Sequence, residues 1–301
     1  MKRNLLLLAL VPLLGLLSCE TEDPVRVSGV RLAPANLNFA VINTFDATAQ
    51  LNATVSPQDA TNPTVRWNSS NEAVATVDGN GKVSIVGVGS TTITATTVDG
   101  GFTATSEVLV AQWATRNVDL STANGFTANI GEPGMLFTWG TNVGISPTNP
   151  DNRHSNIWSG GKWVQVPSTE LGFENGNTWT VAGNPCPTGW RVPTAAEFQT
   201  LLDMERVVIS ATRAGQMNLG NVEGMLFGAS SSNVDFDAER HLFFPFIVIR
   251  DVDTGFEGVP FGNYWSSSVS GTFANSLTLT GNVQLSASGR HSGFPVRCVV
   301  E

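Results

Sequence analysis

Short stretches of alternating apolar and polar residues fill the segment from residue 28 to residue 110. The clearest of them are AQLNATV (49–55), TVRWNS (64–69), AVATVD (73–78), KVSIVG (82–87) and TTITATTVD (91–99). Alternation with a period of two buries only one face of a strand. Turn-forming Pro, Gly, Asn and Asp residues separate the stretches, and no segment of helical period interrupts them. Strands this short and this evenly spaced predict two antiparallel sheets packed face to face.

The longest continuous motif of this segment is VRWNSSNEAVATVDGNGKVSIVGVGSTTITATT, residues 65–97. A tryptophan strand, a Ser-Asn turn, a VATVD strand, a G-KV hairpin and a G-TTITAT strand follow one another. In this order they resemble the bacterial Ig-like group 2 domain. The resemblance implies an Ig-like sandwich over residues 28–111 that serves as a spacer or stalk. It also implies that Trp67 belongs to the core rather than to a ligand platform.

The remainder of the chain, residues 112–301, differs in character from the first segment. Glycine-rich loops lengthen, and seven tryptophans occur, namely Trp113, Trp139, Trp158, Trp163, Trp179, Trp190 and Trp265. One helix is predicted over AAEFQTLLDME (195–205), because Thr194 and Glu197 have the spacing of a capping box before an apolar face. No motif crosses residues 110–113, which predicts two separately folding domains.

Five motifs of this second domain occur in a fixed order: WATRNVD (113–119), GMLFTWG (134–140), NPCPTGWRVPTAAEFQTLL (184–202), GNYWSSS (262–268) and GFPVRCV (293–299). Together they resemble the Fibrobacter succinogenes major paralogous domain, which is common in exported proteins of Bacteroidetes and Fibrobacteres. The resemblance implies an α+β domain related to C-type lectin-like and formylglycine-generating-enzyme-like domains. The predicted fold class is therefore multidomain, an all-β Ig-like sandwich followed by an α+β C-type lectin-like domain.

The N-terminus has the pattern of an export signal. Lys2 and Arg3 precede the apolar run LLLLALVPLLGLL (5–17), which is too short to span a bilayer and has the length of a signal-peptide core. The run ends at LLSC (16–19), which resembles the lipobox of bacterial lipoproteins. The resemblance implies removal of residues 1–18 and attachment of lipid to Cys19. The alternative is an ordinary signal peptide that ends at a cysteine by chance.

Residues 19–27 are predicted to form a short tether that contains the acidic run ETED. In Bacteroidetes lipoproteins acidic residues at this place resemble a surface-export signal, and a solvated linker is the compatible alternative. We therefore expect a lipid anchor in the outer membrane and exposure on the cell surface. The net charge of −9 and the lack of a basic cluster argue against nucleic acid as a partner.

Once Cys19 is assigned to lipid, Cys186 and Cys298 remain. An even pair in an oxidising compartment predicts a disulfide bond, with two free buried thiols as the alternative. The bond would tie the start of the predicted helix to the last strand, as the whole-domain disulfide of lectin-like folds does. In the chain-entropy model it would contribute roughly 4–5 kcal/mol.

Catalytic signatures are missing from the sequence. There is no GxSxG elbow, phosphate-binding glycine loop or HExxH motif, and His154, His241 and His291 are scattered. The calcium-dependent sugar motifs of animal C-type lectins are also absent. Asp251, Asp253 and Glu257 could supply oxygen ligands to calcium, and a solvated turn is the alternative. No other cofactor is expected.

The sequence thus predicts a non-catalytic surface lipoprotein, whose Ig-like stalk presents a lectin-like head for adhesion to a glycan or a surface protein. The alternatives are a structural or fimbria-associated subunit, and an enzyme on a formylglycine-generating-like head. Ligand contacts are expected within residues 210–262, where strand and helix patterning is weakest and acidic residues gather. Inside that segment, FFPFIVIR (243–250) predicts a central buried strand.

Overall fold

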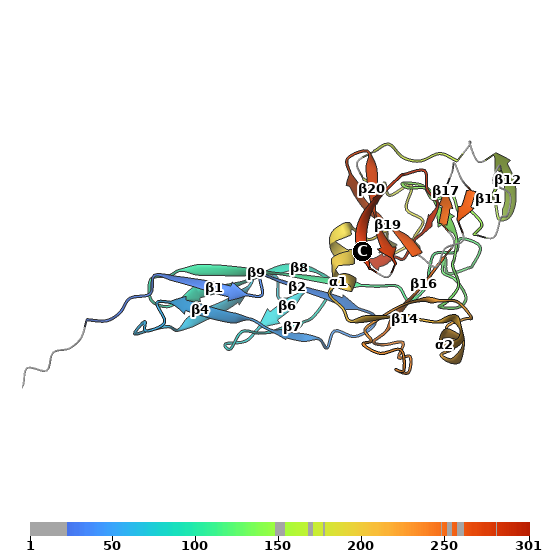
Figure 1. Cartoon of the computed structure of the whole chain (residues 1–301). Coiled ribbons are helices and arrows are strands. Elements are labelled where there is room, and N and C mark those ends of the chain that lie inside the picture. Colours follow the sequence, from blue (N-terminus) through green and yellow to red (C-terminus); the bar gives the residue numbers. More distant parts are fainter. Residues whose placement is uncertain are drawn as a thin grey trace, which may run out of the picture.

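The computed structural model describes residues 23–147, 154–167, 171–176, 178–247, 249–251, 255–257, 262–280 and 282–301. The predicted signal segment and Cys19 lie outside these residues. Two units follow one another along the chain: an elongated unit of strands and, at its far end, a broader head with two short helices (Figure 1). The predicted fold class, an all-β Ig-like sandwich followed by an α+β domain, is confirmed.

The elongated unit is built from nine strands: β1 Gly29–Ala33, β2 Asn36–Val41, β3 Thr48–Gln50, β4 Asn52–Ser56, β5 Val65–Ser69, β6 Ala75–Val77, β7 Lys82–Ile85, β8 Gly89–Thr97 and β9 Thr103–Gln112. A four-stranded sheet has the order β2-β9-β8-β5, a three-stranded sheet the order β3-β7-β6, and β1 pairs with β4. All pairs are antiparallel except β2 with β9, which run parallel. The strands predicted from alternation are therefore present.

Alternation produces this core directly. Along β8 the buried residues are every second one, from Thr91 through Ile93 to Thr97, and they face the cluster that also contains Val83. Trp67 is half-buried and packs against the same cluster. Gly81 turns the β6–β7 hairpin with a φ of +82°, and a Cβ there would lie 2.7 Å from the Trp67 ring. Only glycine fits this turn without strain.

The head contains fourteen strands and two helices among its described residues: β10 Leu136–Phe137, β11 His154–Ser159, β12 Lys162–Pro167, β13 Trp190–Arg191, α1 Ala195–Leu202, β14 Arg206–Ile209, α2 Ala211–Gln216, β15 Gly224–Phe227, β16 Leu242–Pro245, β17 Ile249–Asp251, β18 Gly255–Glu257, β19 Gly262–Ser270, β20 Phe273–Leu279, β21 Gln284–Ser288, β22 Phe294–Pro295 and β23 Val299–Val300. Two three-stranded sheets, β14-β15-β16 and β19-β20-β21, form its largest layers, and the other sheets are two-stranded.

Helix α1 begins where the sequence predicts. The Thr194 hydroxyl accepts a hydrogen bond from the Glu197 backbone N–H, and the Glu197 carboxylate accepts one from the Thr194 backbone N–H. This reciprocal capping box is complete. Phe198 and Leu201 are fully buried in the largest core cluster of the head.

The prediction of one central buried strand over residues 243–250 is wrong. Phe243 and Phe244 are fully buried, but β16 is the edge strand of its sheet and ends at Pro245, which has no N–H to donate. Residues 249–251 form a separate hairpin with β18. Residues 210–262, where the sequence patterning is weakest, nevertheless contain α2, β15 and β16.

The junction between the two units is packed. Ile42 and Ala111, at the ends of the stalk strands, belong to the same buried cluster as Trp113 and Phe198. The Asn38 side-chain amide donates to the carboxylate of Asp203, the residue that caps α1, at 2.7 Å. Figure 1 shows α1 lying against the end of the paired strands β2 and β9. Independent folding of the stalk stays a prediction, although nothing in this contact resembles a flexible linker.

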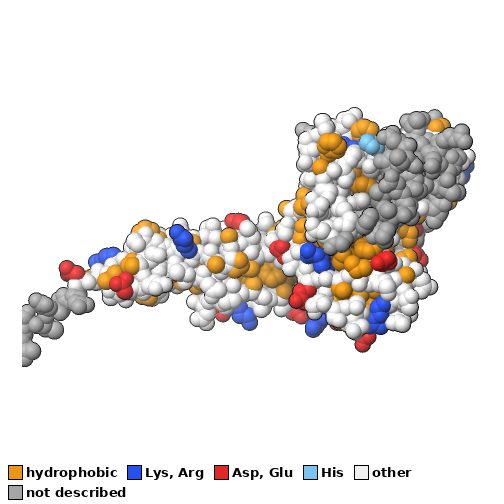
Figure 2. Space-filling view, in the orientation of Figure 1, with side chains coloured by type: hydrophobic (Ala, Val, Ile, Leu, Met, Phe, Trp, Pro, Cys, Tyr) orange, Lys and Arg blue, Asp and Glu red, His pale blue; other side chains and the backbone are white. Residues whose placement is uncertain are grey.

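The surface carries few charges. On the face shown in Figure 2, Lys and Arg side chains are scattered among Asp and Glu over both units, without a basic patch among the described residues. In the same part of the chain, no helix has the length and hydropathy needed to cross a membrane.

Candidate binding site in the head

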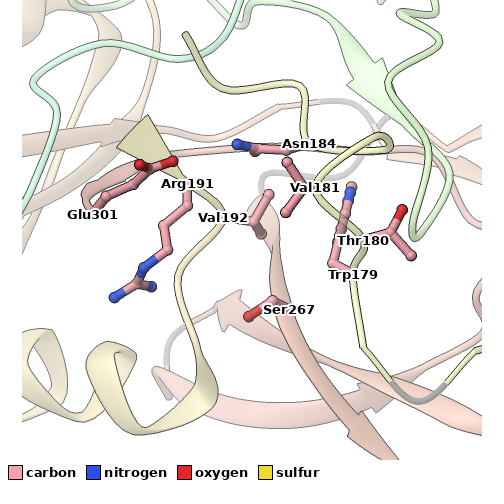
Figure 3. Close-up of a pocket in the computed structure, with 8 residues that line it drawn as sticks. All are labelled: Trp179, Thr180, Val181, Asn184, Arg191, Val192, Ser267 and Glu301. Carbon is pink, nitrogen blue, oxygen red and sulfur yellow. The ribbon is translucent and has the colours of Figure 1, made fainter. Parts of the chain in front are cut away.

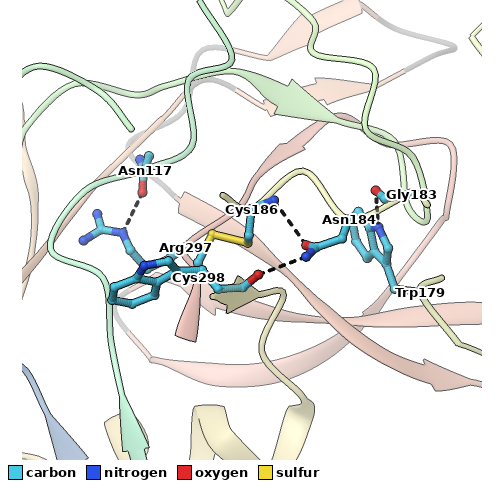
Figure 4. The surroundings of a disulfide bond; sticks show 8 residues. Asn117, Trp179, Gly183, Asn184, Cys186, Arg297 and Cys298 are labelled. Atoms are coloured by element: carbon cyan, nitrogen blue, oxygen red, sulfur yellow. Dashed lines mark hydrogen bonds between the residues drawn. A yellow bond between two sulfur atoms is a disulfide. The ribbon is translucent and has the colours of Figure 1, made fainter. Parts of the chain in front are cut away.

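The disulfide bond lies at the centre of the head. Cys186 is bonded to Cys298 across a sequence separation of 112 residues. The Asn184 side chain accepts a hydrogen bond from the Cys186 backbone N–H and donates one to the Trp190 carbonyl oxygen (Figure 4). The bond therefore ties the loop that precedes β13 to the end of the chain, next to a helix start that is itself capped.

Arg297, beside Cys298, is completely buried. Its guanidinium donates to the side-chain oxygen of Asn117 at 2.8 Å and to the carbonyl oxygens of Ala114 and Phe243, and it lies 4.4 Å from the centre of the Phe244 ring. Burial lowers the pKa of Arg297 to about 10, so the group remains charged at neutral pH. Hydrogen bonds and an aromatic face satisfy this charge in place of a carboxylate.

Tyr264 completes this buried network. Its hydroxyl donates to the Pro245 carbonyl oxygen at 2.9 Å, and burial raises the pKa of Tyr264 to about 12. The conspicuous sequence motifs of the head thus converge on its interior, where Trp113, Tyr264 and Arg297 are all buried. These buried members of the motifs build the fold rather than a binding surface.

An ion pair stands at the start of α1. Arg191 makes two hydrogen bonds to the Glu197 carboxylate, at 2.6 and 2.8 Å. Burial by itself would raise the pKa of Glu197, but hydrogen bonds from Arg191 and from the backbone of Thr194 outweigh it and hold the pKa below its ordinary value. Such a two-pronged pair fixes both side chains in place.

We expect Glu197→Gln to lower the free energy of unfolding by about 1–3 kcal/mol at neutral pH, because the negative charge and one of the two acceptor oxygens for Arg191 are lost. A carboxyl group with a depressed folded-state pKa stabilises above its unfolded pKa, and this stability disappears as pH falls through the folded-state value. The difference from the native chain should therefore shrink below about pH 4. Urea unfolding at several pH values measures it, with the exposed Glu205→Gln as the control; equal losses in the two variants would contradict the assignment.

A pocket opens on the head beside this ion pair. It encloses about 170 Å³ and is lined by Trp179, Thr180, Val181, Asn184, Arg191, Val192, Ser267 and Glu301. In Figure 3, Trp179 and Thr180 lie at one end, Arg191 and Glu301 lie at the other, and Val192 is between them. The pocket thus has an apolar wall and a charged end.

The Trp179 side chain is fixed in position. Its indole N–H donates to the Gly183 carbonyl oxygen at 2.7 Å, and its ring packs on buried Trp139 with ring centres 5.6 Å apart. Trp179 is nevertheless only half-buried, and neighbouring Val181 is 94% exposed. An apolar surface that is held rigid and open to solvent is suited to contact with a ligand.

Polar groups surround this surface. The Ser267 hydroxyl donates to the Pro193 carbonyl oxygen at 3.2 Å, which leaves its oxygen lone pairs for an incoming donor. Arg191 uses two of its five N–H groups on Glu197. Arg191 is the cation at this end of the pocket, and the negative charges of Glu197 and Glu301 both raise its pKa. This end of the pocket is therefore net negative.

The predicted calcium ligands are only partly described. Asp251 lies in β17 and Glu257 in β18, at opposite ends of a paired hairpin. Asp253 lies outside the described residues. Among the residues that the structure does describe, no three His, Cys, Asp or Glu side chains gather to hold a metal ion. The calcium site stays a prediction.

The described part of residues 210–262 borders a wide hollow of about 560 Å³, which includes Asn218, Asn221 and the adjoining Glu132. Glu132 is already occupied, because the Ala128 backbone N–H and the Asn129 amide both donate to its carboxylate. Within residues 210–262, the Asp235 carboxylate lies 3.6 Å from the Arg213 guanidinium. Ligand contacts there stay a prediction as well.

Sequence reasoning missed the partner of Glu197. The capping box identified Glu197, but Arg191 lies six positions earlier, before the helix, and no helical spacing connects the two. It also could not separate exposed tryptophans from buried ones. Trp113, Trp139 and Trp265 are fully buried, whereas Trp163 is 43% exposed and Trp179 lines the pocket.

Residues 26–108 match the bacterial Ig-like domain (group 2), so the stalk contains a domain of this kind. The match covers the nine-stranded unit almost completely. This match does not extend into the head, so the resemblance of the head to the Fibrobacter succinogenes major paralogous domain stays a prediction.

Parts of the chain are similar to bacterial glycoside hydrolases. The chain is 32% identical over 129 residues to an alpha-L-arabinofuranosidase of Bifidobacterium longum, a match that covers 43% of this chain and 12% of that enzyme. It is 48% identical over 66 residues to a 3-O-alpha-D-galactosyl-alpha-L-arabinofuranosidase of the same species, covering 22% and 6%. A Lacto-N-biosidase of Bifidobacterium bifidum is 44% identical over 84 residues, covering 27% and 7%. The chain thus spans only a small fraction of each enzyme.

Among solved structures, a C-terminal fragment of intimin in complex with the intimin-binding domain of its translocated receptor is 14% identical. The match covers 46% of this chain and 62% of that one, with a TM-score of 0.24. An intimin mutant of EHEC O157:H7 is 16% identical over 44% of this chain and 80% of that one, with a TM-score of 0.20. TM-scores this low give no information about function.

Proposed function

We propose that this chain is a non-catalytic lipoprotein of the outer membrane, whose Ig-like stalk presents a lectin-like head for binding at the cell surface. The observation that carries the proposal is the position of the head, at the end of the stalk opposite to the N-terminal segment that precedes β1 (Figure 1). A lipid on Cys19 would attach to the free end of the stalk and leave the head facing outward.

Two further features support presentation rather than catalysis. The packed junction fixes the direction of the head relative to the stalk, which is the property that a spacer needs. The pocket of the head is walled by tryptophan and valine side chains, and its arginine is held by a carboxylate. These groups bind ligands more readily than they transform them. The ligand would be a glycan or another surface protein.

A structural or fimbria-associated subunit is the second function that the same architecture serves. Stable co-purification of the chain with other surface proteins would favour it, whereas a head that binds a free ligand would favour adhesion. An enzyme on a formylglycine-generating-like head is the third reading, and activity on any substrate would favour it.

The anchor is tested by Cys19→Ser. Without the thiol, no lipid can be attached, so we expect the variant in the soluble or unprocessed fraction, while the native chain remains in the outer-membrane fraction. Ser18→Ala serves as the matched control, because it keeps a small residue before the cysteine. Protease added to intact cells should digest the head of the native chain. A Cys19→Ser variant that remained normally processed and membrane-bound would overturn the proposal.

A further inference from the structure

The pocket beside Trp179 combines three features that together restrict its ligand. Its volume of about 170 Å³ is below the roughly 300–1,000 Å³ of pockets that enclose drug-sized molecules, so it has room for a single small ring. One wall is apolar, formed by Trp179, Val181 and Val192, and its tryptophan is held in place by the Gly183 carbonyl oxygen and the Trp139 ring. Around it lie hydroxyl, guanidinium and carboxylate groups that can donate and accept hydrogen bonds.

A pyranose ring fits this combination of surfaces. One face of a hexose carries mainly C–H groups and packs on a flat indole, while its hydroxyls point outward from the ring edge. Trp179 offers such a face without loss of side-chain freedom, because the Gly183 carbonyl and the Trp139 ring already hold it. The Ser267 oxygen and the Glu301 carboxylate can accept hydroxyl protons, and the N–H groups of Arg191 not used by Glu197 can donate.

Charge decides which sugars are admitted. Arg191 is neutralised by Glu197 through two short hydrogen bonds, and Glu301 adds a second carboxylate near it. An acidic sugar would bring a third carboxylate to this end without a free cation to pair with it. Like charges at such a site disfavour binding.

We propose that this pocket binds one ring of a neutral carbohydrate and discriminates against acidic sugars. The inference rests on the proposed binding function of the head and names its ligand class and its site. It places recognition outside residues 210–262, with Ser267 on strand β19 just beyond that range, and it requires no metal ion.

The test uses the chain from residue 19 onward with Cys19→Ser, titrated with methyl glycosides of glucose, galactose and mannose. Methyl glucuronide is the charged counterpart of the glucoside. We expect saturation-transfer signals from at least one neutral glycoside, with a Kd of about 1 mM, and at least about tenfold weaker binding of the glucuronide. Chelation of calcium should leave the binding unchanged.

Variants locate the site. Val181→Asp adds a negative charge and removes an apolar contact at a side chain that is 94% exposed, so it should preserve the fold and weaken binding about tenfold. Val208→Asp is the matched control on β14, where Val208 is 39% exposed and outside the pocket. Asn221→Ala, in the hollow, should also leave binding unchanged.

Two results with the native residues would overturn the inference: no saturation-transfer signal from any neutral glycoside, or a Kd for the glucuronide equal to that for the glucoside. Two results with variants would also overturn it: equal affinities of Val181→Asp and Val208→Asp for the neutral glycoside, or loss of binding in Asn221→Ala. These results are separable from failure of the proposed function. A ligand found by screening the head that binds Val181→Asp normally would leave the surface-binding proposal standing and remove only this pocket.

Discussion

Replacing Cys186 by Ala should lower the free energy of unfolding of the head by about 5 kcal/mol, the largest effect that we expect from a single substitution. The bond joins residues separated by 112 positions, and in the chain-entropy model a loop of that length restricts the unfolded chain strongly. Cys298 is fully buried, and a free thiol behaves there as a small apolar group, so the loss should come mainly from the missing link.

Denaturant unfolding followed by tryptophan fluorescence measures this effect selectively, because seven of the eight tryptophans lie in the head. Reduction of the native chain by dithiothreitol provides the control. Reduction should lower the free energy of unfolding of the native chain by about as much as the substitution does, and it should not lower that of Cys186→Ala any further. If reduced and oxidised native chains unfolded at the same denaturant concentration, the bond would not have the stabilising role assigned to it.

Local patterns explain why much of the fold could be predicted from the sequence. The strands of the stalk alternate along β8 and β5, with one side chain in two facing the core, and the capping box at Thr194 depends only on residues three apart. The disulfide needed no geometry at all, because two cysteines remained after Cys19 was assigned to lipid. Each of these signals is contained within a few residues or within a simple count.

The features that could not be predicted depend on contacts between distant residues. Strand β15 is buried on both faces, so its run GMLF shows no alternation by which it could be recognised. Arg297 looks like a surface residue by type, yet it is buried because the backbone at Ala114 and Phe243 supplies acceptors from two other segments. The pocket likewise gathers residues from three separate stretches, 179–184, 191–192 and 267, together with Glu301.

The packed junction is the most consequential feature that sequence patterning did not reveal. Trp113 is 1% exposed and lies in the cluster shared by the stalk and the head. Its indole N–H donates to the Thr200 hydroxyl at 3.1 Å, and its ring centre lies 5.2 Å from that of Phe198 on α1. Its backbone N–H donates to the Val41 carbonyl oxygen of the stalk. One residue therefore connects stalk strand β2, through its backbone, with the first helix of the head, through its side chain.

We expect Trp113→Ala to lower the free energy of unfolding by about 3–5 kcal/mol, because truncation of a fully buried tryptophan leaves a cavity. The loss should also separate the two units. In the native chain the shared core should make far-UV circular dichroism, which reports both units, coincide with tryptophan fluorescence, which reports mainly the head. In the variant the fluorescence transition should move to lower denaturant while the stalk transition remains.

Two controls distinguish the junction from a general loss of aromatic surface. Trp113→Phe keeps most of the ring but not its hydrogen bond, so it should cost about 1–2 kcal/mol and leave the transitions coincident. Trp163→Ala, at a side chain that is 43% exposed on β12, should change stability by no more than about 0.5 kcal/mol. If the native chain already showed two transitions, the shared core would not couple the unfolding of the two units, and the independent folding predicted from the sequence would be favoured instead.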